Sequence, residues 1–306
     1  MGIRYSVQRA LAYRTLRREA RYPGNTIQSK IRYKMAWDRS PILTTFADKI
    51  AVRAFIESRL GVDYLVPLWG IFDRAEEIDF VALPREFAIK VNHGSGGVII
   101  VSERADRESR LPDHLNVGWE RFTIHPDSFD REHAVAVLNH WLGMSFEWWP
   151  GRTPEWAYRH VEPQILVEKF LDSNSDGGLV EYKVYVANGT VLAFRLIKGS
   201  VTGIQRAAFF TRELTRLPIL YLDNGFPAYA PWEDDVTPSL GAELVALAEQ
   251  LMSGIDFGRV DCIVDNGVLR VGEITNYPTA GEYTYIPESF NSVIGSGWNP
   301  NYKRKR

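Results

Sequence analysis

Apolar residues recur at helical spacing in several stretches of the chain, and glycine and proline separate these stretches. The predicted helices are residues 1–40 with a break at Pro23-Gly24, a segment capped by Thr44 or Thr45 that ends at Leu60 before Gly61, residues 130–142 and residues 239–252. Asp48, Lys49 and Arg53 lie on the second helix. We expect these side chains at the surface unless that helix faces a cleft.

Short apolar runs between these helices predict β-strands. Single strands are expected at residues 64–66, 87–91, 98–101 and 165–167, and hairpins at 180–187 with 190–197 and at 260–264 with 268–274. Asn188-Gly189 and Asp265-Asn266-Gly267 are typical of the turns that join such strands. Because helices and hairpins are interleaved, the predicted fold class is α+β.

Composition and charge narrow the class of protein. The chain has 306 residues, enough for two domains, and its 45% hydrophobic and 24% charged residues are ordinary for a globular protein. Residues 1–40 carry a net charge of +8 and residues 303–306 carry +4, so residues 41–302 carry −14. The acidic body argues against a nucleic-acid partner. The basic ends are either solvated or in contact with an anionic membrane surface or acidic polymer.

The sequence also bears on location. It has no run of 18 apolar residues, and arginines interrupt the N-terminal segment where a secretory signal would need an apolar core. The single cysteine, Cys262, cannot form an internal disulfide. We therefore expect a cytoplasmic protein, with peripheral membrane contact through its basic termini as an open alternative.

A glycine-rich segment joins two of the predicted strands. Lys90 lies near the end of the first strand, and His93-Gly94-Ser95-Gly96-Gly97 follows. Glycines let backbone N–H groups converge on an anion, while Ser95 adds a hydroxyl and Lys90 a positive charge. The segment is neither a Walker loop nor a dinucleotide-binding GxGxxG motif, because no Gly-Lys-Ser/Thr follows and the next element is a strand. It predicts either a phosphate-binding loop or a glycine-rich hairpin turn.

The second hairpin carries two carboxylates and an arginine. Asp261 and Glu273 lie on neighbouring strands and can share a hard cation such as Mg²⁺. A two-residue turn, Asn266-Gly267, would point them to opposite faces of the sheet. A three-residue turn that includes Asp265 would place both on one face, with Arg259 opposite Glu273. A cross-strand ion pair on a solvated face explains the same residues.

Two further segments carry charges on strands. The strand at 165–167 leads into Glu168-Lys169-Phe170. Glu181 and Lys183 share one face of the first hairpin, where they can contact a ribose, a phosphate or each other. The sequence has no Gly-x-Ser-x-Gly nucleophile elbow of a serine hydrolase and no His-Glu-x-x-His zinc motif.

These segments, in this order, resemble the ATP-grasp superfamily. Within it they are similar to the TupA-like family, which is associated with teichuronopeptide and capsular polysaccharide biosynthesis. The resemblance covers about residues 40–290 and rests on segments 47–49, 83–90, 92–96, 167–171, 181–183, 259–261 and 272–275. It implies an ATP-grasp fold, in which two α+β subdomains grip ATP, with a helical, basic N-terminal extension.

The resemblance implies domain bounds and residue roles. Residues 1–75 would form a helical region that precedes the ATP-grasp fold, residues 76–165 its small subdomain and residues 166–306 its C-terminal subdomain with the metal site. The residues it assigns to ATP are Lys90 and Lys183 at the phosphates, His93, Gly94, Ser95, Gly96 and Gly97 in the loop that closes over them, Glu168, Lys169 and Phe170 at adenine, and Glu181 at the ribose or metal. Arg259, with Lys90 and Lys183, would stabilise the transferring phosphoryl group.

Asp261 and Glu273 match the Mg²⁺ ligands of the family. Many relatives have an asparagine as a third ligand two residues after that glutamate. Here Thr275 holds that position and Asn276 follows, so water, Thr275 and Asn276 are all open as the third ligand.

The implied activity is ATP-dependent ligation of a carboxylate to an amine through an acyl phosphate, with ATP and Mg²⁺. The predicted partners are a carboxylate and an amine (an amino acid, amino sugar or peptide), with a glycan or polymer as a possible acceptor. The process would be polysaccharide, peptidyl-polymer or natural-product biosynthesis. Arg195, Lys198, Arg206 and the loop 276–285 are candidates for the acceptor site. The alternatives are an ATP-grasp kinase acting on a small molecule or sugar, and a non-catalytic nucleotide-binding protein of envelope assembly.

Overall fold

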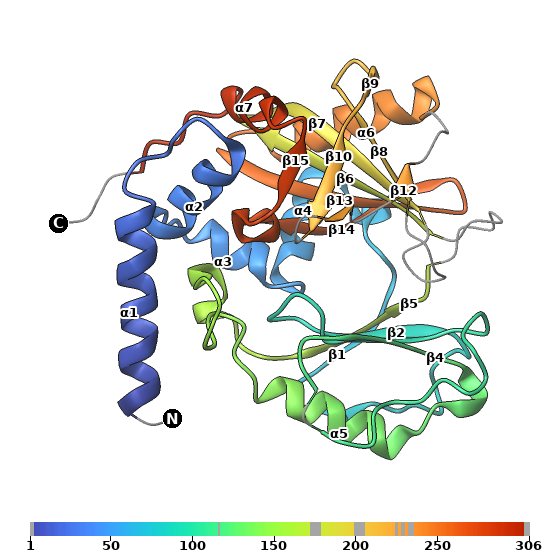
Figure 1. Ribbon diagram of the computed structural model, residues 1–306. Helices are drawn as coiled ribbons and strands as arrows, with labels where there is room; N and C mark the ends of the chain where they lie inside the picture. Colours follow the sequence, from blue (N-terminus) through green and yellow to red (C-terminus); the bar gives the residue numbers. More distant parts are fainter. Residues whose placement is uncertain are drawn as a thin grey trace.

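The chain folds into two lobes. The computed structural model describes residues 3–115, 117–171, 179–198, 206–223, 226–227, 230–231 and 236–302. The smaller lobe has a five-stranded sheet packed against α5 (Arg131–Leu142), and the larger lobe has a seven-stranded sheet with a three-stranded sheet beside it (Figure 1). The predicted α+β class is therefore confirmed.

The two lobes have different strand orders. The small sheet has the order β1-β5-β2-β3-β4, formed by Leu68–Phe72, Ile165–Lys169, Phe87–Val91, Val98–Val101 and Arg121–Ile124. The large sheet has the order β12-β8-β7-β6-β13-β14, formed by Ala230–Pro231, Arg206–Phe210, Thr190–Lys198, Val180–Ala187, Phe257–Asp265 and Val268–Thr275, with β9 (Arg216–Leu217) paired to β8. The third sheet contains β11 (Phe226–Pro227), β10 (Leu220–Asp223) and β15 (Thr284–Ile286).

Side-chain alternation explains how the large sheet positions a site. On β13, Val260 and Cys262 are buried in the core that contains residues of α6 (Pro238–Leu251), while Phe257 is buried in the core on the other face, with residues of α2 (Ile27–Trp37) and α7 (Ser289–Ser296). Arg259 and Asp261 alternate with Val260 and therefore share the face of Phe257. Charged side chains thus line the sheet next to an apolar core.

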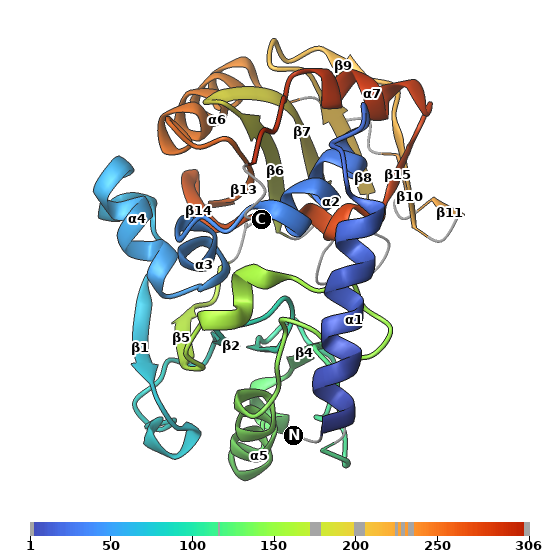
Figure 2. The same cartoon turned by 90° about the vertical axis from the view of Figure 1, so that its left-hand side faces the viewer.

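The N-terminal segment folds as predicted into two helices that break at Pro23-Gly24. The first, α1 (Ile3–Glu19), runs along one side of both lobes (Figure 2). The Tyr5 hydroxyl donates to the Trp148 carbonyl at 2.7 Å, and the Tyr13 hydroxyl donates to Glu147 at 2.7 Å. These bonds attach α1 to the loop that follows α5.

The predicted helix ending at Leu60 is wrong in its continuity. It is two helices, α3 (Ile42–Ala47) and α4 (Ala51–Leu60). The Asp48 carboxylate accepts the Ile50 backbone N–H at 2.8 Å and the Asn92 side-chain amide at 2.9 Å. An aspartate that bonds the nearby backbone competes with helix formation, and here it turns the chain toward the glycine-rich segment.

Several elements differ from the sequence prediction. Residues 62–64 form a 3₁₀-helix, and residue 65 makes a single bridge to Val271 in place of the predicted strand at 64–66. β1, β4, β8, β15 and α7 were not predicted. The small sheet includes β1, which lies before the predicted domain bound at 75, and β5, which crosses the predicted bound at 165. These domain bounds stay predictions. Short 3₁₀-helices also occur at Ala75–Glu77, Pro126–Ser128, Trp156–His160 and Pro278–Gly281.

In the part of the chain that the structure describes, no helix has both the length and the apolar character needed to cross a membrane. The basic tail 303–306 lies outside the described residues.

Candidate functional site

Asp261 and Glu273 are brought to one face of the sheet by a bulge. The turn between β13 and β14 has two residues, Asn266 and Gly267, both with positive φ. Such a turn would separate the two carboxylates, but the register shifts between Asp261 and Cys262, at Gly272 on the partner strand. Asp261 therefore pairs directly with Glu273, and Arg259 pairs with Thr275 instead of Glu273. The three-residue turn considered in the sequence is therefore wrong, but Asp261 and Glu273 do share one face of the sheet.

Asp261 is the centre of an ion-pair network on this face. It accepts Arg259 Nε at 2.6 Å and Nη2 at 2.7 Å, and Lys183 Nζ at 2.8 Å, while Lys183 also contacts Glu181 at 3.0 Å. Burial alone would raise the pKa of the Asp261 carboxyl, but the charges of Arg259 and Lys183 outweigh burial and lower it. Asp261 is thus ionised and fully engaged by protein cations.

Glu273 is the accessible carboxylate of the pair. Its side chain is 40% exposed, compared with 9% for Asp261. It lies 3.7 Å from Arg259 and accepts the Thr275 hydroxyl at 3.4 Å. Asn276 does not line the cavity that Glu273 and Thr275 face, and its side-chain amide donates to the Leu43 carbonyl at 2.7 Å. Of the two candidate third ligands, Thr275 is therefore the one placed beside Glu273.

Lys90 and Glu168 form an ion pair on the small sheet. Lys90 Nζ lies 2.6 Å from one carboxylate oxygen of Glu168, and Arg53 Nη1 lies 3.0 Å from the other. Arg53 was expected at the surface, but it binds this buried carboxylate. Lys169 points to the other side of β5 and contacts Asp265 at 2.9 Å. Phe170, immediately after β5, is partly buried.

The glycine-rich segment packs closely against Trp119. A Cβ atom on Gly94 would lie 2.4 Å from the Trp119 ring, and one on Gly96, whose φ is +93°, would lie 2.3 Å from the Trp119 carbonyl oxygen. His93 is buried, with Nε2 3.2 Å from the Met144 carbonyl, and burial lowers the pKa of its imidazole. Gly97 is also buried, whereas Ser95 is exposed. Ser95 is therefore the most accessible residue of this segment.

Lys49 is a site residue that the sequence analysis did not assign. It follows the break between α3 and α4, and its Nζ donates to the Gly94 carbonyl. Burial lowers the pKa of its ammonium group, and Glu273 opposes that shift. Lys49 thus contacts the glycine-rich segment and interacts electrostatically with Glu273 on the large sheet. Its motif, Ala47-Asp48-Lys49, was the signal, but the interrupted helix was not predicted.

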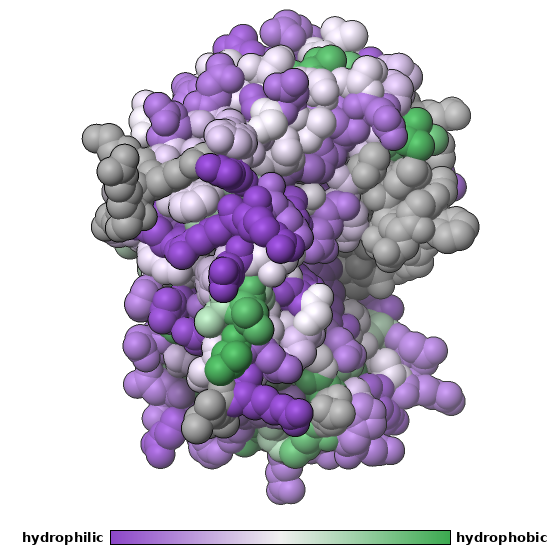
Figure 3. Space-filling model, turned by 60° about the vertical axis from the view of Figure 1, so that its left-hand side comes forward, coloured by the Kyte–Doolittle hydropathy of each residue, from purple (hydrophilic) through white to green (hydrophobic). Residues whose placement is uncertain are grey.

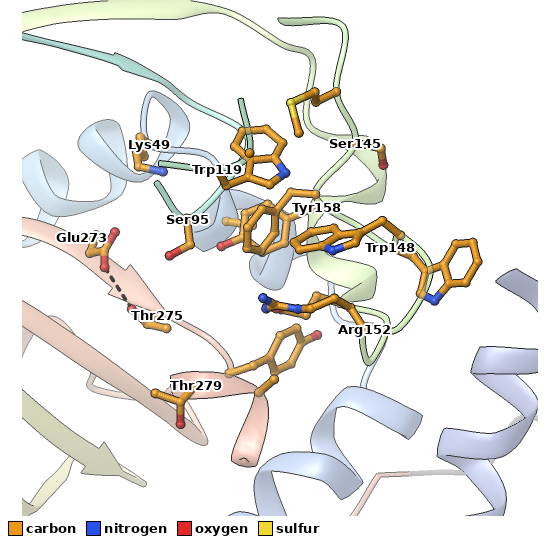
Figure 4. Close-up of a pocket in the computed structure, with 18 of the residues that line it drawn as sticks. Lys49, Ser95, Trp119, Ser145, Trp148, Arg152, Tyr158, Glu273, Thr275 and Thr279 are labelled. Atoms are coloured by element: carbon orange, nitrogen blue, oxygen red, sulfur yellow. Dashed lines mark hydrogen bonds and ion pairs between the residues drawn. The ribbon is translucent and has the colours of Figure 1, made fainter. Parts of the chain in front are cut away.

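A cavity of about 950 Å³ lies between the glycine-rich segment and the face of the large sheet that carries Glu273. Lys49 and Ser95 line it from one side, Arg259, Glu273 and Thr275 from the large sheet (Figure 4). Its remaining wall is rich in aromatic residues and comes from α1, from the end of α3, from residues 117–119 and 140–158, and from residues 277–283, which lie within the loop 276–285. The space therefore joins a charged region to an aromatic one.

Arg152 and Glu155 are the charged groups of the aromatic region. Arg152 lies 4.5 Å from the centre of the Trp149 ring, and Figure 4 shows its guanidinium extending toward the middle of the cavity. Burial raises the pKa of Glu155 to about 8, against the lowering effect of Arg152 at 3.7 Å. The predicted acceptor residue Arg195 is instead buried, 5.8 Å from the Phe209 ring, and does not line this cavity. Arg206 is exposed on β8, and Lys198 is partly buried at the end of β7.

Of the predicted site residues, Ser95, Arg259, Glu273 and Thr275 line the cavity directly. Asp261, Lys183 and Glu181 lie behind Arg259 in one ion-pair network, and Lys90 with Glu168 forms a separate pair on the small sheet. Within the described ranges, no group of three His, Cys, Asp or Glu side chains is arranged to hold a metal ion. The structure therefore presents two carboxylates and a hydroxyl, with the cations arranged around them.

Solved structures similar to this chain include D-alanine–D-alanine ligases and an ATP-grasp protein with a RimK domain. D-alanine–D-alanine ligase from Bacillus anthracis, complexed with ATP, is 12% identical with a TM-score of 0.39, and the match covers 77% of this chain and 56% of that one. The corresponding ligase from Helicobacter pylori is 13% identical with a TM-score of 0.45, covering 84% and 62%. A RimK domain ATP-grasp protein from Sphaerobacter thermophilus is 14% identical with a TM-score of 0.39, covering 85% and 69%.

The chain spans less than two thirds of the length of both D-alanine–D-alanine ligases. A comparison with curated proteins finds no match. Residues 26–298 match the family described as TupA-like ATPgrasp, a range that includes all three sheets and begins after α1. The chain therefore belongs to the TupA-like ATP-grasp family, and its fold is the ATP-grasp fold of that family.

Proposed function

We propose that this protein is an ATP-dependent ligase that joins a carboxylate to an amine through an acyl phosphate. The observation that carries the proposal is the cavity between the lobes, which places Lys49, Arg259 and Glu273 at one end and Arg152 among aromatic rings at the other. A ligase of this kind needs a phosphate site next to an organic substrate site. Membership of the ATP-grasp family supports the same reaction class.

In the proposed reaction, an oxygen of the substrate carboxylate attacks the γ-phosphorus of ATP, and ADP leaves. The amine nitrogen then attacks the acyl phosphate carbonyl, loses a proton, and inorganic phosphate leaves. The protein's task is to position the reactants and to offset negative charge. Arg259, beside Glu273 at the cavity, is the candidate for stabilising the transferring phosphoryl group. Exclusion of water from the cavity when the substrates bind would protect the acyl phosphate from hydrolysis.

The cations assigned to ATP are held by carboxylates in this structure. Lys90 is paired with Glu168, and Lys183 and Arg259 are paired with Asp261. Phosphate oxygens bind ammonium and guanidinium groups through the same charge-assisted hydrogen bonds. We infer that ATP phosphates take over part of these contacts when they bind. Adenine would lie at Glu168, Lys169 and Phe170, and its ribose near Glu181.

The oxygen atoms near Glu273 can be compared with those that Mg²⁺ prefers. Magnesium in nucleotide sites is commonly held by one or two carboxylates, with phosphates and waters completing six oxygens. Glu273 and Asp261 on one face, with the Thr275 hydroxyl, fit that arrangement, and Glu273 is the more accessible. When bound, Mg²⁺ would neutralise phosphate charge. Thr275, which lines the cavity, fits as a ligand better than Asn276, which does not line it.

The acceptor end favours an anionic organic substrate. Arg152 provides a fork for a carboxylate, and the surrounding rings provide faces for an apolar or sugar ring. We propose a uronic acid, an amino acid or a peptidyl polymer as the substrate class, in polysaccharide or natural-product biosynthesis. Because the reaction consumes ATP, the cytoplasm is the proposed location.

The test is consumption of Mg²⁺-ATP against a panel of carboxylates and amines, with mass detection of products. ADP and phosphate release that requires both partners, with a product lighter than their sum by one water, is the expected result. Phosphorylation of a hydroxyl without any amine requirement would instead identify a kinase. Glu273→Gln, assayed in parallel, identifies turnover that belongs to this site.

A further inference from the structure

A second cavity, lined by arginines, lies outside the proposed active site. It has a volume of about 340 Å³ and lies where α1, the end of α2 and the 3₁₀-helix Trp156–His160 meet. Its four arginines are Arg9, Arg17, Arg39 and Arg159, and the other lining residues are Ser6, Ala10, Tyr13 and Trp156. None of these residues lines the larger cavity. We call this set the arginine pocket.

The arginine pocket has more positive charge than its surroundings neutralise. Arg9 is paired with Glu147 at 3.2 Å, and that carboxylate also accepts the Tyr13 hydroxyl. The nearby Asp38 is paired with Lys34 at 2.8 Å. For Arg17, Arg39 and Arg159, the described residues offer no carboxylate within ion-pair distance. Three guanidinium charges therefore remain without a carboxylate partner.

Arg39 is fixed by bonds that leave its charge in place. It donates to the Ala36 carbonyl at 3.0 Å and the Met35 carbonyl at 3.1 Å, and its guanidinium lies 5.3 Å from the centre of the Trp156 ring. These contacts satisfy the carbonyls at the end of α2 but supply no formal negative charge. Burial, followed by the charge of Arg17, lowers the pKa of Arg39, so the two arginines are close enough to repel.

We infer that the arginine pocket binds a phosphate-bearing ligand, either a phosphate monoester or a diphosphate. A phosphate group carries up to two negative charges and three acceptor oxygens in a compact volume, so guanidinium groups from several elements can bind it at once. A carboxylate carries one charge and matches a single guanidinium fork. Tyr13 and Ser6 add hydroxyls, and Trp156 offers a ring face for the organic part of the ligand. The inference does not depend on the proposed ligase activity.

The outer face of α1 bears on the source of the phosphate. Arg4, Arg14 and Arg18 are exposed there, and Val7 and Leu11 between them are each 53% exposed. Figure 3 shows an apolar patch on this side of the molecule between strongly hydrophilic side chains. Such a face suits the headgroup region of an anionic membrane. The ligand is therefore either a soluble phosphate ester or the phosphate of a lipid headgroup, which two probes can separate.

The first experiment is calorimetric titration of the full chain with inorganic pyrophosphate. The pocket variant is Arg17→Gln with Arg159→Gln, which removes two charges with no ion pair, and the matched control is Arg14→Gln with Arg18→Gln on the outer face of α1. Circular dichroism establishes that both variants are folded. We expect the pocket variant to lose one class of sites, with affinity weaker by about tenfold or more, and the control to match the wild type. Pyrophosphate bound in the nucleotide cleft contributes equally to all three proteins.

The second experiment uses vesicles of phosphatidylcholine with and without phosphatidic acid. Sedimentation with phosphatidic acid that requires Arg17 and Arg159 supports a lipid headgroup as the source, and pyrophosphate binding alone supports a soluble ester. Equal losses of pyrophosphate affinity in the pocket and control variants would mean general electrostatic attraction and would overturn the inference. So would unchanged affinity in the pocket variant, or tighter binding of polyglutamate than of pyrophosphate through the same two arginines.

Discussion

Asp261 and Glu273 lie directly opposite each other on β13 and β14, although the turn between these strands has two residues. The bulge at Gly272 corrects the register by one residue and turns both carboxylates to the face that carries Arg259 and Lys183. Without the bulge, Glu273 would point to the opposite face of the sheet. The carboxylate pair thus depends on an irregularity in the sheet.

Glu273→Gln should abolish turnover and leave the fold intact. Its side chain is 40% exposed, so the substitution should cost little stability. It removes the negative charge and the proposed ligand to Mg²⁺. We expect a loss of about 100-fold or more in ATP consumption. Asp261→Asn should be inactive too, but it leaves Arg259 and Lys183 underpaired, and unfolding in urea should reveal a loss of stability.

The matched control for these variants is Glu103→Gln. Glu103 is exposed on the small lobe and contacts Arg85. It should retain wild-type activity and stability, since exposed ion pairs contribute little. Activity near the wild-type level in Glu273→Gln would refute the metal assignment.

Lys90→Ala should weaken ATP binding. The substitution removes a charge assigned to the phosphates, and we expect about tenfold weaker affinity by calorimetry. Glu168 keeps its partner Arg53 at 3.0 Å, so the carboxylate does not become unpaired. Affinity equal to that of the wild type would count against a phosphate role for Lys90.

Arg152→Ala should affect the acceptor substrate and not ATP. Its guanidinium lies in the aromatic region of the cavity, 4.5 Å from the Trp149 ring. We expect KM for the carboxylate substrate to rise about tenfold, with KM for ATP unchanged. Arg74→Ala, an exposed arginine paired with Glu77, is the control. A parallel rise in both KM values would place Arg152 outside the acceptor site.

Glu155 should make stability depend on pH. Its pKa is raised by burial from 4.5 to about 8, so between these values the folded protein binds one more proton than the unfolded chain. This group therefore makes the free energy of unfolding decrease as pH rises through that window, by about 1.4 kcal/mol per pH unit. Glu155→Gln should flatten the dependence, which urea unfolding at about pH 5 and about pH 8 measures. An equally steep decrease in the variant would mean that Glu155 ionises normally.

Gly94→Ala should destabilise the small lobe. The new Cβ would lie 2.4 Å from the Trp119 ring, a clash that we expect to cost about 1–3 kcal/mol. Trp119→Ala in the same chain should recover part of that cost, and a double-mutant cycle in thermal unfolding measures the coupling. Additive effects would show that the loop does not rest on Trp119.

The chain's local pattern was enough to identify most elements near the site. Short apolar runs and turn residues predicted the strands that carry Lys90 and Lys183 and the strand that leads into Glu168. The order of motifs predicted the family that the match at residues 26–298 establishes. These features could be predicted because side-chain periodicity and turn residues depend only on residues that are close in sequence.

Contacts between distant segments could not be predicted in this way. Only the folded chain shows that Arg53 reaches Glu168, that Lys49 reaches the Gly94 carbonyl, and that Arg152 joins the cavity. The sequence by itself determined the fold class, the family and the residue types of the site. The tertiary structure decided which charges meet, because a break at Asp48 and a bulge at Gly272 redirect side chains in ways that a regular helix or strand period does not contain.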